Sequence, residues 1–271
     1  MSLLQKLLTA KLVTLTKDDL SGVTNIKQYC FNYQSNLTSV EIPDSVEFIG
    51  AYAFGYNPNL NTFVMGKNVT YIGTTIFDKS NGLTNIDMED MNPYCEIYGN
   101  TFIDTSWFAN QPEESVFIVA NGQMIVGNKL STPSNGLEIP STVKTLASYC
   151  FYKYGDTVDS NFTKAVIPDT IEMVQHNVFS AQSALTQITI GSSVNRITGC
   201  LTPGTYITDL IFRQPAGMSI ELPEAGTDYG LGYKKDSYSM NIYTDNECIK
   251  NYDWATDNVT ATFYSLSEAP V

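Results

Sequence analysis

Two adjacent segments of equal length carry the same pattern of apolar residues. The first, LTSVEIPDSVEFIGAYAFGYNPN, runs from Leu37 to Asn59, and the second, LNTFVMGKNVTYIGTTIFDKSNG, runs from Leu60 to Gly82. Each begins with Leu and an alternating apolar run, passes through a turn to Ile-Gly, and has a Phe four residues after that Gly. A period in the low twenties predicts a solenoid, in which each unit is too small to close a core alone and is buried by its neighbours.

The apolar anchors of this pattern recur along the chain. They are Ile26 and Phe31, Ile49 and Phe54, Ile72 and Phe77, Ile97 and Phe102, Leu146 and Phe151, and Val174 and Phe179, and the pattern decays at Ile197. We expect Ile49 to lie over Ile72 at about 4.8 Å, the spacing of neighbouring strands. Phe54 is expected to lie over Phe77 in the same way.

Strand-like runs precede most of these anchors. They read LTSVEIP, LNTFVMG, LTNIDME, GLEIP, KAVIP and LTQITIG, and their apolar residues alternate. Pro43, Pro140 and Pro168 end three of the runs, as expected of a residue that cannot donate to a sheet ladder. The sequence therefore predicts a β-rich solenoid.

The repeat LTSVEIPDSVEFIGAYAFGYN resembles the BspA-type leucine-rich repeat, with Asn57 in place of a final Cys. The segment from Thr105 to Leu130 resembles an insert of that family, in which a Trp-containing turn precedes a β-hairpin. Asn121-Gly122 would form the hairpin tip. The tail MNIYTDNECIKNYDWATDNVTATFYSL is similar to the family's terminal cap. The resemblance, over roughly residues 21–266, implies a leucine-rich repeat solenoid with an internal β-hairpin insert and a C-terminal β cap.

Three regions are predicted: an N-terminal amphipathic helix at 1–20, the solenoid at 21–203 with an insert near 103–136, and a degenerate repeat with the cap at 204–271. Leucines recur at helical spacing in the first region: Leu3, Leu4, Leu7, Leu8 and Leu12. This short helix either covers the end of the core or docks the chain to a larger assembly. Lys6 and Lys11 interrupt the apolar run, so we expect neither an export signal nor membrane insertion.

The net charge excludes one class of partner. At −13, with charged residues making up 16% of the chain, the protein lacks the clustered Lys and Arg that nucleic acid binding needs. The 17 Tyr and 13 Phe residues suit a β-rich protein with uncharged faces.

No catalytic or cofactor motif is found, and we predict a non-enzyme without cofactor or metal. His176, the single histidine, occupies a variable repeat position, where we expect a surface or half-packed side chain. The acidic turn Asp87–Asp90 is explained equally by a weak calcium site and by solvation. Cys30 and Cys150 stand where Ala53 stands in another repeat, so we expect both to be buried as small apolar residues.

Tyrosines recur in two slots of the repeat: Tyr29, Tyr52 and Tyr149 in one, and Tyr33 and Tyr56 in the other. Because neighbours of a buried residue on an extended chain point the other way, the rings are expected to line up outside. One interpretation is a ladder that stabilises the solenoid. The other is a contact face, since Tyr is enriched at recognition surfaces.

Proteins that resemble the BspA-type repeat are often bacterial surface adhesins, and short relatives with a tail like IYTDNECIKNYDW look like products of bacteriophage or prophage genomes. The resemblance implies a non-enzymatic virion surface component, such as a tail fibre, receptor-binding or capsid-decoration protein. It would be made in the bacterial cytoplasm and would bind protein or cell-surface glycan, other virion proteins, or itself. The alternatives are a bacterial adhesin, a cytoplasmic interaction scaffold, and a carbohydrate-active virion enzyme.

Overall fold

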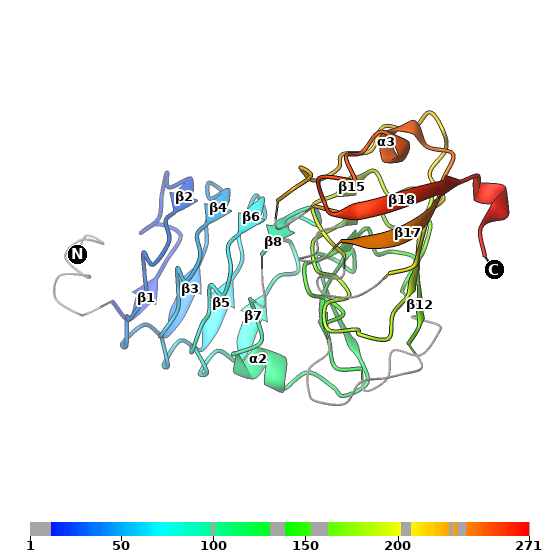
Figure 1. Cartoon of the computed structure of the whole chain (residues 1–271). Helices are drawn as coiled ribbons and strands as arrows, with labels where there is room; N and C mark the ends of the chain where they lie inside the picture. The colour runs from blue at the N-terminus through cyan, green and yellow to red at the C-terminus, as the bar shows by residue number, and fades with distance from the viewer. Residues whose placement is uncertain are drawn as a thin grey trace. The chain divides into compact units, whose positions relative to one another are not determined.

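The computed structural model describes residues 12–98, 101–130, 139–152, 162–201, 207–227, 230–231 and 237–270. The chain divides into two compact units. The first unit contains Met1–Pro112 and Ile118–Gly122, and the second contains Glu113–Phe117 and Gln123–Val271. Parallel strands from successive repeats form the sheets of both units, so the fold is the predicted β-solenoid (Figure 1).

Two four-stranded parallel sheets build the first unit. One contains β1 (Thr14–Leu15), β3 (Ser39–Glu41), β5 (Thr62–Val64) and β7 (Asn85–Asp87). The other contains β2 (Asn25–Ile26), β4 (Phe48–Ile49), β6 (Tyr71–Ile72) and β8 (Glu96–Ile97). A short helix, α2 (Ser106–Ala109), follows. Figure 1 shows β1, β3, β5 and β7 side by side as one ladder.

The repeat anchors form the core, as the spacing predicts. Ile26, Ile49 and Ile72 are paired in register on successive strands, and all the anchor residues named above are buried. Phe31 and Phe54 stack with ring centroids 5.4 Å apart. The ring of Phe63 contacts Phe54 and Phe77 edge-on, at 5.1 and 4.8 Å, so it contributes a third aromatic side chain to this column.

The Gly of the Ile-Gly motif allows the repeats to approach closely. A Cβ added at Gly50 would lie 2.4 Å from the backbone nitrogen of Gln28, and one at Gly73 would lie 2.5 Å from that of Ala51. Real Cβ contacts are never this short, so any side chain at these positions would force neighbouring turns apart.

Asn57, in the slot of the family's Cys, holds three backbone groups together. Its Nδ2 donates to the carbonyl oxygens of Phe31 and Phe54, both at 2.9 Å, and its Oδ1 accepts from the backbone N–H of Gln34. The side chain is fully buried. A buried amide that satisfies carbonyls of two repeats fixes their spacing, because without it the Phe31 carbonyl and the Gln34 N–H would lose a partner away from water; the Phe54 carbonyl also accepts from the Ser80 hydroxyl.

The remaining strands form two further sheets, and of these strands only β9 is shared between the two units. One has the order β15 (Arg196–Ile197), β13 (Met173–Val174), β11 (Thr145–Leu146), β10 (Met124–Asn128) and β9 (Val116–Val119). The other has the order β12 (Lys164–Ile167), β14 (Gln187–Ile190), β16 (Asp209–Phe212), β17 (Tyr238–Tyr243) and β18 (Val259–Tyr264). Helix α3 (Glu247–Lys250) connects β17 to β18, and a 3-10 turn, η1 (Leu266–Glu268), follows.

The predicted hairpin and terminal cap are both present. The turn between β9 and β10 contains Asn121 and Gly122, both with positive φ. The cap consists of β17 and β18, which are the longest strands described, and α3. The predicted domain boundaries at residues 20 and 203 stay predictions.

The predicted N-terminal helix is wrong over residues 12–20. Thr14 and Leu15 form β1, which pairs in parallel with Ser39 and Val40. Leu12 and Leu15 are both buried in the first repeat, so the leucine spacing here reflects strand and turn positions rather than a helix. Leu3, Leu4, Leu7 and Leu8 lie outside the described residues, as does most of the predicted strand GLEIP.

Candidate functional site

Four tyrosines of the first unit, Tyr29, Tyr33, Tyr52 and Tyr56, lie on turns in which successive backbone N–H groups donate alternately to the next repeat and within the turn. The N–H groups of Tyr29, Phe31 and Tyr33 donate to carbonyls of the next repeat, whereas those of Cys30 and Asn32 donate within their own turn. The following repeat repeats this alternation from Tyr52 to Tyr56. In each turn the Phe between the two tyrosines is buried, whereas Tyr29 and Tyr33 are exposed and Tyr52 and Tyr56 are half-buried.

Each of these tyrosines has a left-handed backbone. Their φ angles are 61° at Tyr29, 58° at Tyr33, and 56° at both Tyr52 and Tyr56. Thr75 and Lys79, at the equivalent positions of the next repeat, also have positive φ. The conformation belongs to the slot, and a side chain with a Cβ adopts it at a cost of about 1–2 kcal/mol.

The four side chains form what we call the tyrosine ladder: Tyr29, Tyr33, Tyr52 and Tyr56. Tyr29 stacks on Tyr52 with centroids 5.2 Å apart, and Tyr33 stacks on Tyr56 at 4.5 Å. The ladder continues with Lys79, whose Nζ lies 5.2 Å from the centroid of the Tyr56 ring. Tyr29 is 52% exposed and Tyr33 is 66% exposed, so stacking leaves much of both rings open to solvent.

Two carboxyl groups from successive repeats meet beside this ladder, a pair that sequence spacing did not reveal. The pKa of the Asp104 carboxyl is raised, first by partial burial and then by its interaction with the nearby Asp78 carboxyl. Lys79 acts in the opposite direction. The Asp78 backbone carbonyl accepts from the Tyr56 N–H at 2.6 Å, which ties the pair to the ladder.

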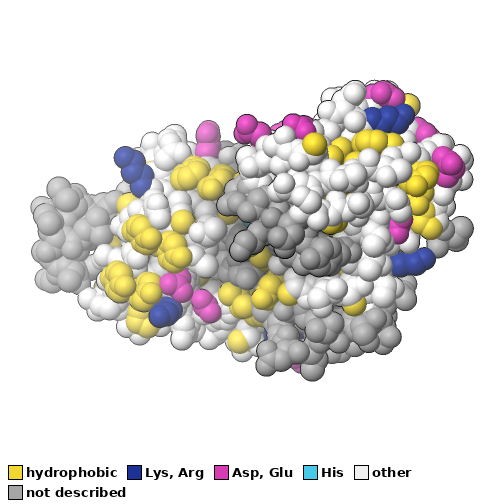
Figure 2. Space-filling model, in the orientation of Figure 1, with side chains coloured by type: hydrophobic (Ala, Val, Ile, Leu, Met, Phe, Trp, Pro, Cys, Tyr) yellow, Lys and Arg dark blue, Asp and Glu magenta, His cyan; other side chains and the backbone are white. Residues whose placement is uncertain are grey.

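A second aromatic stack was missed in the sequence. Phe48, Tyr71 and Tyr98 lie on β4, β6 and next to β8, with centroids 4.6 and 5.1 Å apart, and all three are half-buried. Phe48 and Tyr71 directly precede the Ile of the Ile-Gly motif, so this stack could have been predicted from the alignment of the repeats. Figure 2 shows yellow side chains in groups over the first unit, with few charged side chains among them.

Tyr149 belongs to the second unit. It packs edge-on against Tyr152 at 6.0 Å and His176 at 5.8 Å, and its hydroxyl accepts a hydrogen bond from Asn177 Nδ2 at 2.7 Å. Its backbone is left-handed like that of the other tyrosines, with φ of 60°. Whether it joins a common contact face stays a prediction.

The expectation of a surface or half-packed His176 is wrong. Its side chain is buried, with Nδ1 3.0 Å from Ser148 Oγ, and burial lowers its pKa to about 4. The slot faces the interior in this repeat, and a neutral imidazole with a hydroxyl partner satisfies it. Because both side chains are buried, this Ser-His pair has no access to a substrate.

Of the two cysteines expected to be buried, one is buried and the other is exposed. Cys150 is buried as predicted, and its pKa is raised by that burial. Cys30 is exposed, so the expectation is wrong for this residue, although partial burial still raises the pKa of its thiol. All five cysteines are free.

The acidic turn shows a local hydrogen bond. The Asp87 carboxylate accepts from the backbone N–H of Glu89 at 3.2 Å. Across the described residues, no three His, Cys, Asp or Glu side chains gather as metal ligands would. Nor does any helix in the described ranges have the length and apolar content needed to cross a bilayer.

The repeat geometry agrees with a match to a known family. The BspA type leucine rich repeat region matches residues 11–125 and 101–216, in six copies. The chain belongs to this family. In this BspA-type repeat protein the matched residues include both turns of the tyrosine ladder and both strands of the predicted hairpin.

The solved structures that match the chain share little sequence with it and have low TM-scores. The pneumococcal vaccine antigen PcpA is 14% identical over 90% of this chain and 84% of its own, with a TM-score of 0.31. A leucine rich cell surface protein from Faecalibacterium prausnitzii is 15% identical over 93% of this chain and 78% of its own, with a TM-score of 0.37. No curated protein matches the chain.

Proposed function

We propose that this BspA-type repeat protein is a non-enzymatic, adhesin-like binding protein and that the tyrosine ladder is its contact face. Membership of the repeat family supports a binding role. The observation that carries the proposal is the combination of left-handed backbones and exposed rings at Tyr29 and Tyr33. Gly or Asn would relieve the backbone cost at these slots, so tyrosines held there point to a use for the rings.

The chemistry of the ladder suits a protein or a cell-surface glycan. Stacked tyrosine rings present a flat apolar face with hydroxyl groups at its edge, and such side chains lose little entropy on binding. Lys79 and the Asp78–Asp104 pair add charges of both signs at one end. The net charge of −13 disfavours nucleic acid.

The proposed location is the surface of a bacteriophage particle, where the chain would serve as a tail fibre, receptor-binding or capsid-decoration protein. The resemblance of the tail segment to phage and prophage products supports this. Density-gradient-purified particles from a lysed culture of the source strain provide the test. Peptides of this chain should band with intact particles, and their copy number would separate decoration protein from tail tip. Recovery only in the soluble fraction, as for a cytoplasmic scaffold, would contradict the location.

The contact face has its own test, which does not depend on the location. The double variant Tyr29→Gly and Tyr33→Gly removes two rings while Gly suits the left-handed backbone, so the fold should be kept. Binding of the purified protein to cells of the source strain should fall at least about tenfold, the loss expected when two aromatic anchors are removed. The matched control, Phe48→Thr and Tyr71→Thr, removes the other aromatic stack and should bind as the parent does. Equal losses in both variants would contradict the assignment to the ladder.

The non-enzymatic assignment can be overturned by a third measurement. Asp78 and Asp104 are a carboxyl pair beside an aromatic surface, which is the side-chain chemistry that glycoside hydrolysis uses. We expect no sugar release from host cell walls by the purified protein. Release that disappears in Asp104→Asn would identify an enzyme.

A further inference from the structure

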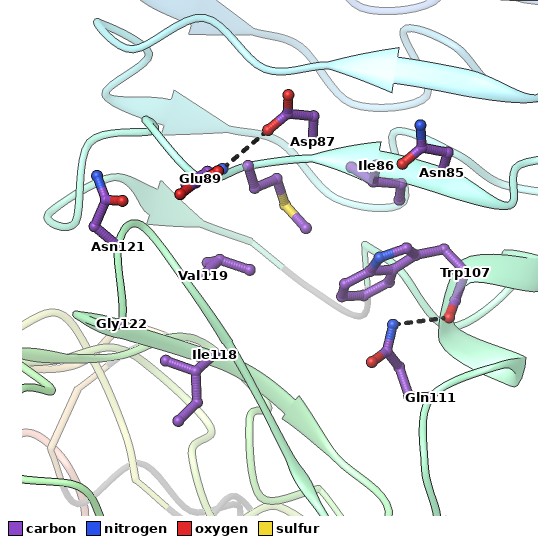
Figure 3. Close-up of a pocket in the computed structure, with 11 residues that line it drawn as sticks. Asn85, Ile86, Asp87, Glu89, Trp107, Gln111, Ile118, Val119, Asn121 and Gly122 are labelled. Carbon is purple, nitrogen blue, oxygen red and sulfur yellow. Dashed lines mark hydrogen bonds between the residues drawn. The ribbon is translucent and has the colours of Figure 1, made fainter.

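A groove of about 740 Å³ lies along β7, the last strand of its sheet. All eleven residues that line it belong to the first unit. Figure 3 shows β7 along one side, the segment Ile118–Gly122 along the other, Trp107 toward one end and Asn121 toward the other. Its volume falls within the roughly 300–1,000 Å³ range of protein binding clefts.

The groove exposes an unpaired strand edge. In the sheet order β1-β3-β5-β7, the only strand neighbour of β7 within the described residues is β5. On the paired side, Asn85 N–H donates to Asn61 and Asp87 carbonyl accepts from Met65 N–H. Because alternate residues of a strand face opposite edges, the N–H and C=O of Ile86 point into the groove. Its side chain is buried in the core, so Ile86 offers the groove its backbone.

At each end of this edge, a backbone carbonyl accepts a hydrogen bond from a residue on the groove side. The backbone N–H of Ala120 donates to the Met88 carbonyl at 3.0 Å, and the N–H of Trp107 donates to the Leu83 carbonyl at 2.7 Å. Trp107 is held there by α2, whose N-cap Thr105 accepts from the Phe108 N–H. Between these two contacts, among the described residues, the backbone of Ile86 has no protein partner. The open edge is therefore a slot a few residues long, bounded at each end.

The side chains that line the slot favour an occupant that carries positive charge and can form hydrogen bonds. Asp87 and Glu89 contribute carboxylates, and of the described lining residues none is Lys, Arg or His. Trp107, with Ile118 on the facing segment, adds apolar surface beside the strand edge. The side-chain amides of Asn85 and Gln111 can hydrogen-bond to both the donors and the acceptors of an occupant.

We propose that this groove binds a short, extended, basic peptide segment of a partner protein, which adds to β7 as a parallel fifth strand. The site is distinct from the tyrosine ladder and does not depend on the function proposed for it. Strand addition at an open edge gains its affinity from backbone hydrogen bonds and its preference from side-chain pockets. The parallel register of β5 on β7 predicts one peptide carbonyl on the Ile86 N–H and one peptide N–H, two residues later, on the Ile86 carbonyl.

The first experiment uses the full chain and the probe peptide acetyl-Lys-Val-Thr-Val-Lys-amide, with binding followed by fluorescence polarisation of a labelled copy. Two further peptides carry N-methyl groups, one on both valine nitrogens and one on the threonine nitrogen. Alternate residues of the peptide face opposite edges, so one of the two methylated peptides carries its methyl group on the nitrogen that faces Ile86. That peptide should bind at least about tenfold more weakly, because it loses a backbone hydrogen bond and its methyl group clashes with the strand edge. Undiminished binding by both, or no binding of the parent at about 1 mM, would overturn the proposal.

A second measurement places the probe on the protein. Hydrogen exchange at the Ile86 amide should slow when the parent peptide is added, while the Phe63 amide, inside the sheet, should be unaffected. The variant Asp87→Asn with Glu89→Gln should fold normally, since both side chains are exposed, and should bind the peptide about threefold to tenfold more weakly with less dependence on salt. The control Glu41→Gln neutralises an exposed carboxylate on β3, away from the lining residues, and should bind as the parent does.

Hydrogen exchange at Ile86 also tests whether a second copy of the chain fills the slot. If the Ile86 amide becomes protected as the protein concentration rises, without peptide, and sedimentation shows a dimer, the slot is filled by a second copy of the chain. That result would overturn the assignment to a partner's peptide. Exchange at Ile86 that responds neither to peptide nor to concentration would overturn strand addition altogether.

Discussion

Tyr33 stacks on Tyr56 with ring centroids 4.5 Å apart, although both residues hold φ values, 58° and 56°, that favour glycine. The repeat explains this combination. The N–H of each tyrosine donates to a carbonyl of the following repeat, so the turn fixes the backbone whatever residue occupies the slot. The stacking energy, about 0.5–1.5 kcal/mol, is similar in size to the cost of the left-handed backbone.

Replacing Tyr33 with Gly should therefore change the free energy of unfolding by less than about 1 kcal/mol, because relief of the backbone cost offsets the lost stacking. Tyr33→Ala keeps the backbone cost and should be less stable than Tyr33→Gly. Urea unfolding of the two variants gives the comparison. A loss above about 2 kcal/mol in Tyr33→Gly would make the ladder a stabilising feature of the solenoid rather than a contact face.

Phe54 tests the register of the core. Its ring is fully buried between repeats, and Phe54→Ala should cost about 3–5 kcal/mol through lost burial and the cavity that remains. The control is Tyr29→Ala, which removes a ring that is 52% exposed and should cost far less. An unchanged unfolding midpoint in Phe54→Ala would falsify the proposed stacking of repeats.

Asn57→Ala should cost on the order of 3 kcal/mol, because the Phe31 carbonyl and the Gln34 N–H lose a buried partner, while the Phe54 carbonyl keeps only the Ser80 hydroxyl. Asn59→Ala is the matched control: its side chain is exposed and makes a single bond, to the Ser35 carbonyl. We expect a change below about 1 kcal/mol there. Similar losses in the two variants, measured by chemical denaturation, would show that the buried amide does not hold the repeats together.

His176 predicts a pH dependence of stability. Its folded-state pKa of about 4 lies below the unfolded value of about 6.5, so the unfolded chain binds the proton more readily. The stabilising contribution is present above pH 6.5 and is lost as the pH falls toward 4, by roughly 3 kcal/mol in total. In His176→Gln this part of the decline should disappear, which a series of melts between pH 7 and pH 4 would reveal. Parallel curves for the two proteins would contradict the burial of a neutral imidazole.

The parts of the fold that follow from periodicity were predictable. The Ile and Phe anchors, the strands around Val40 and Phe63, and the hairpin tip at Asn121-Gly122 all follow from local spacing or turn chemistry. These features are readable because each repeat is buried by neighbours with the same pattern, so one copy predicts the surroundings of the next. Tyr29 and Tyr33 are exposed as predicted, although one premise of that prediction, a buried Cys30, is wrong.

Other features required the three-dimensional arrangement. Spacing alone predicts a helix at residues 1–20, yet Thr14–Leu15 is a strand, since pairing with β3 overrides helical periodicity in so short a segment. The variability of its repeat position predicts a surface or half-packed His176, but variability does not show which side of the turn a given repeat buries. The Asp78–Asp104 pair joins residues 26 positions apart, outside the regular period of 23.

The family, the solenoid and the placement of tyrosines on successive turns can be predicted from the residues alone, because each depends on a short pattern that every repeat contains. The three-dimensional arrangement was needed to show that the pairing of its sheet ends at β7 and that α2 and the segment Ile118–Gly122 leave the backbone of Ile86 open in a groove. An open edge is the absence of a neighbour, and no local pattern of residues encodes it. It arises here where the segment Ile118–Gly122, and not a further strand, lies beside β7.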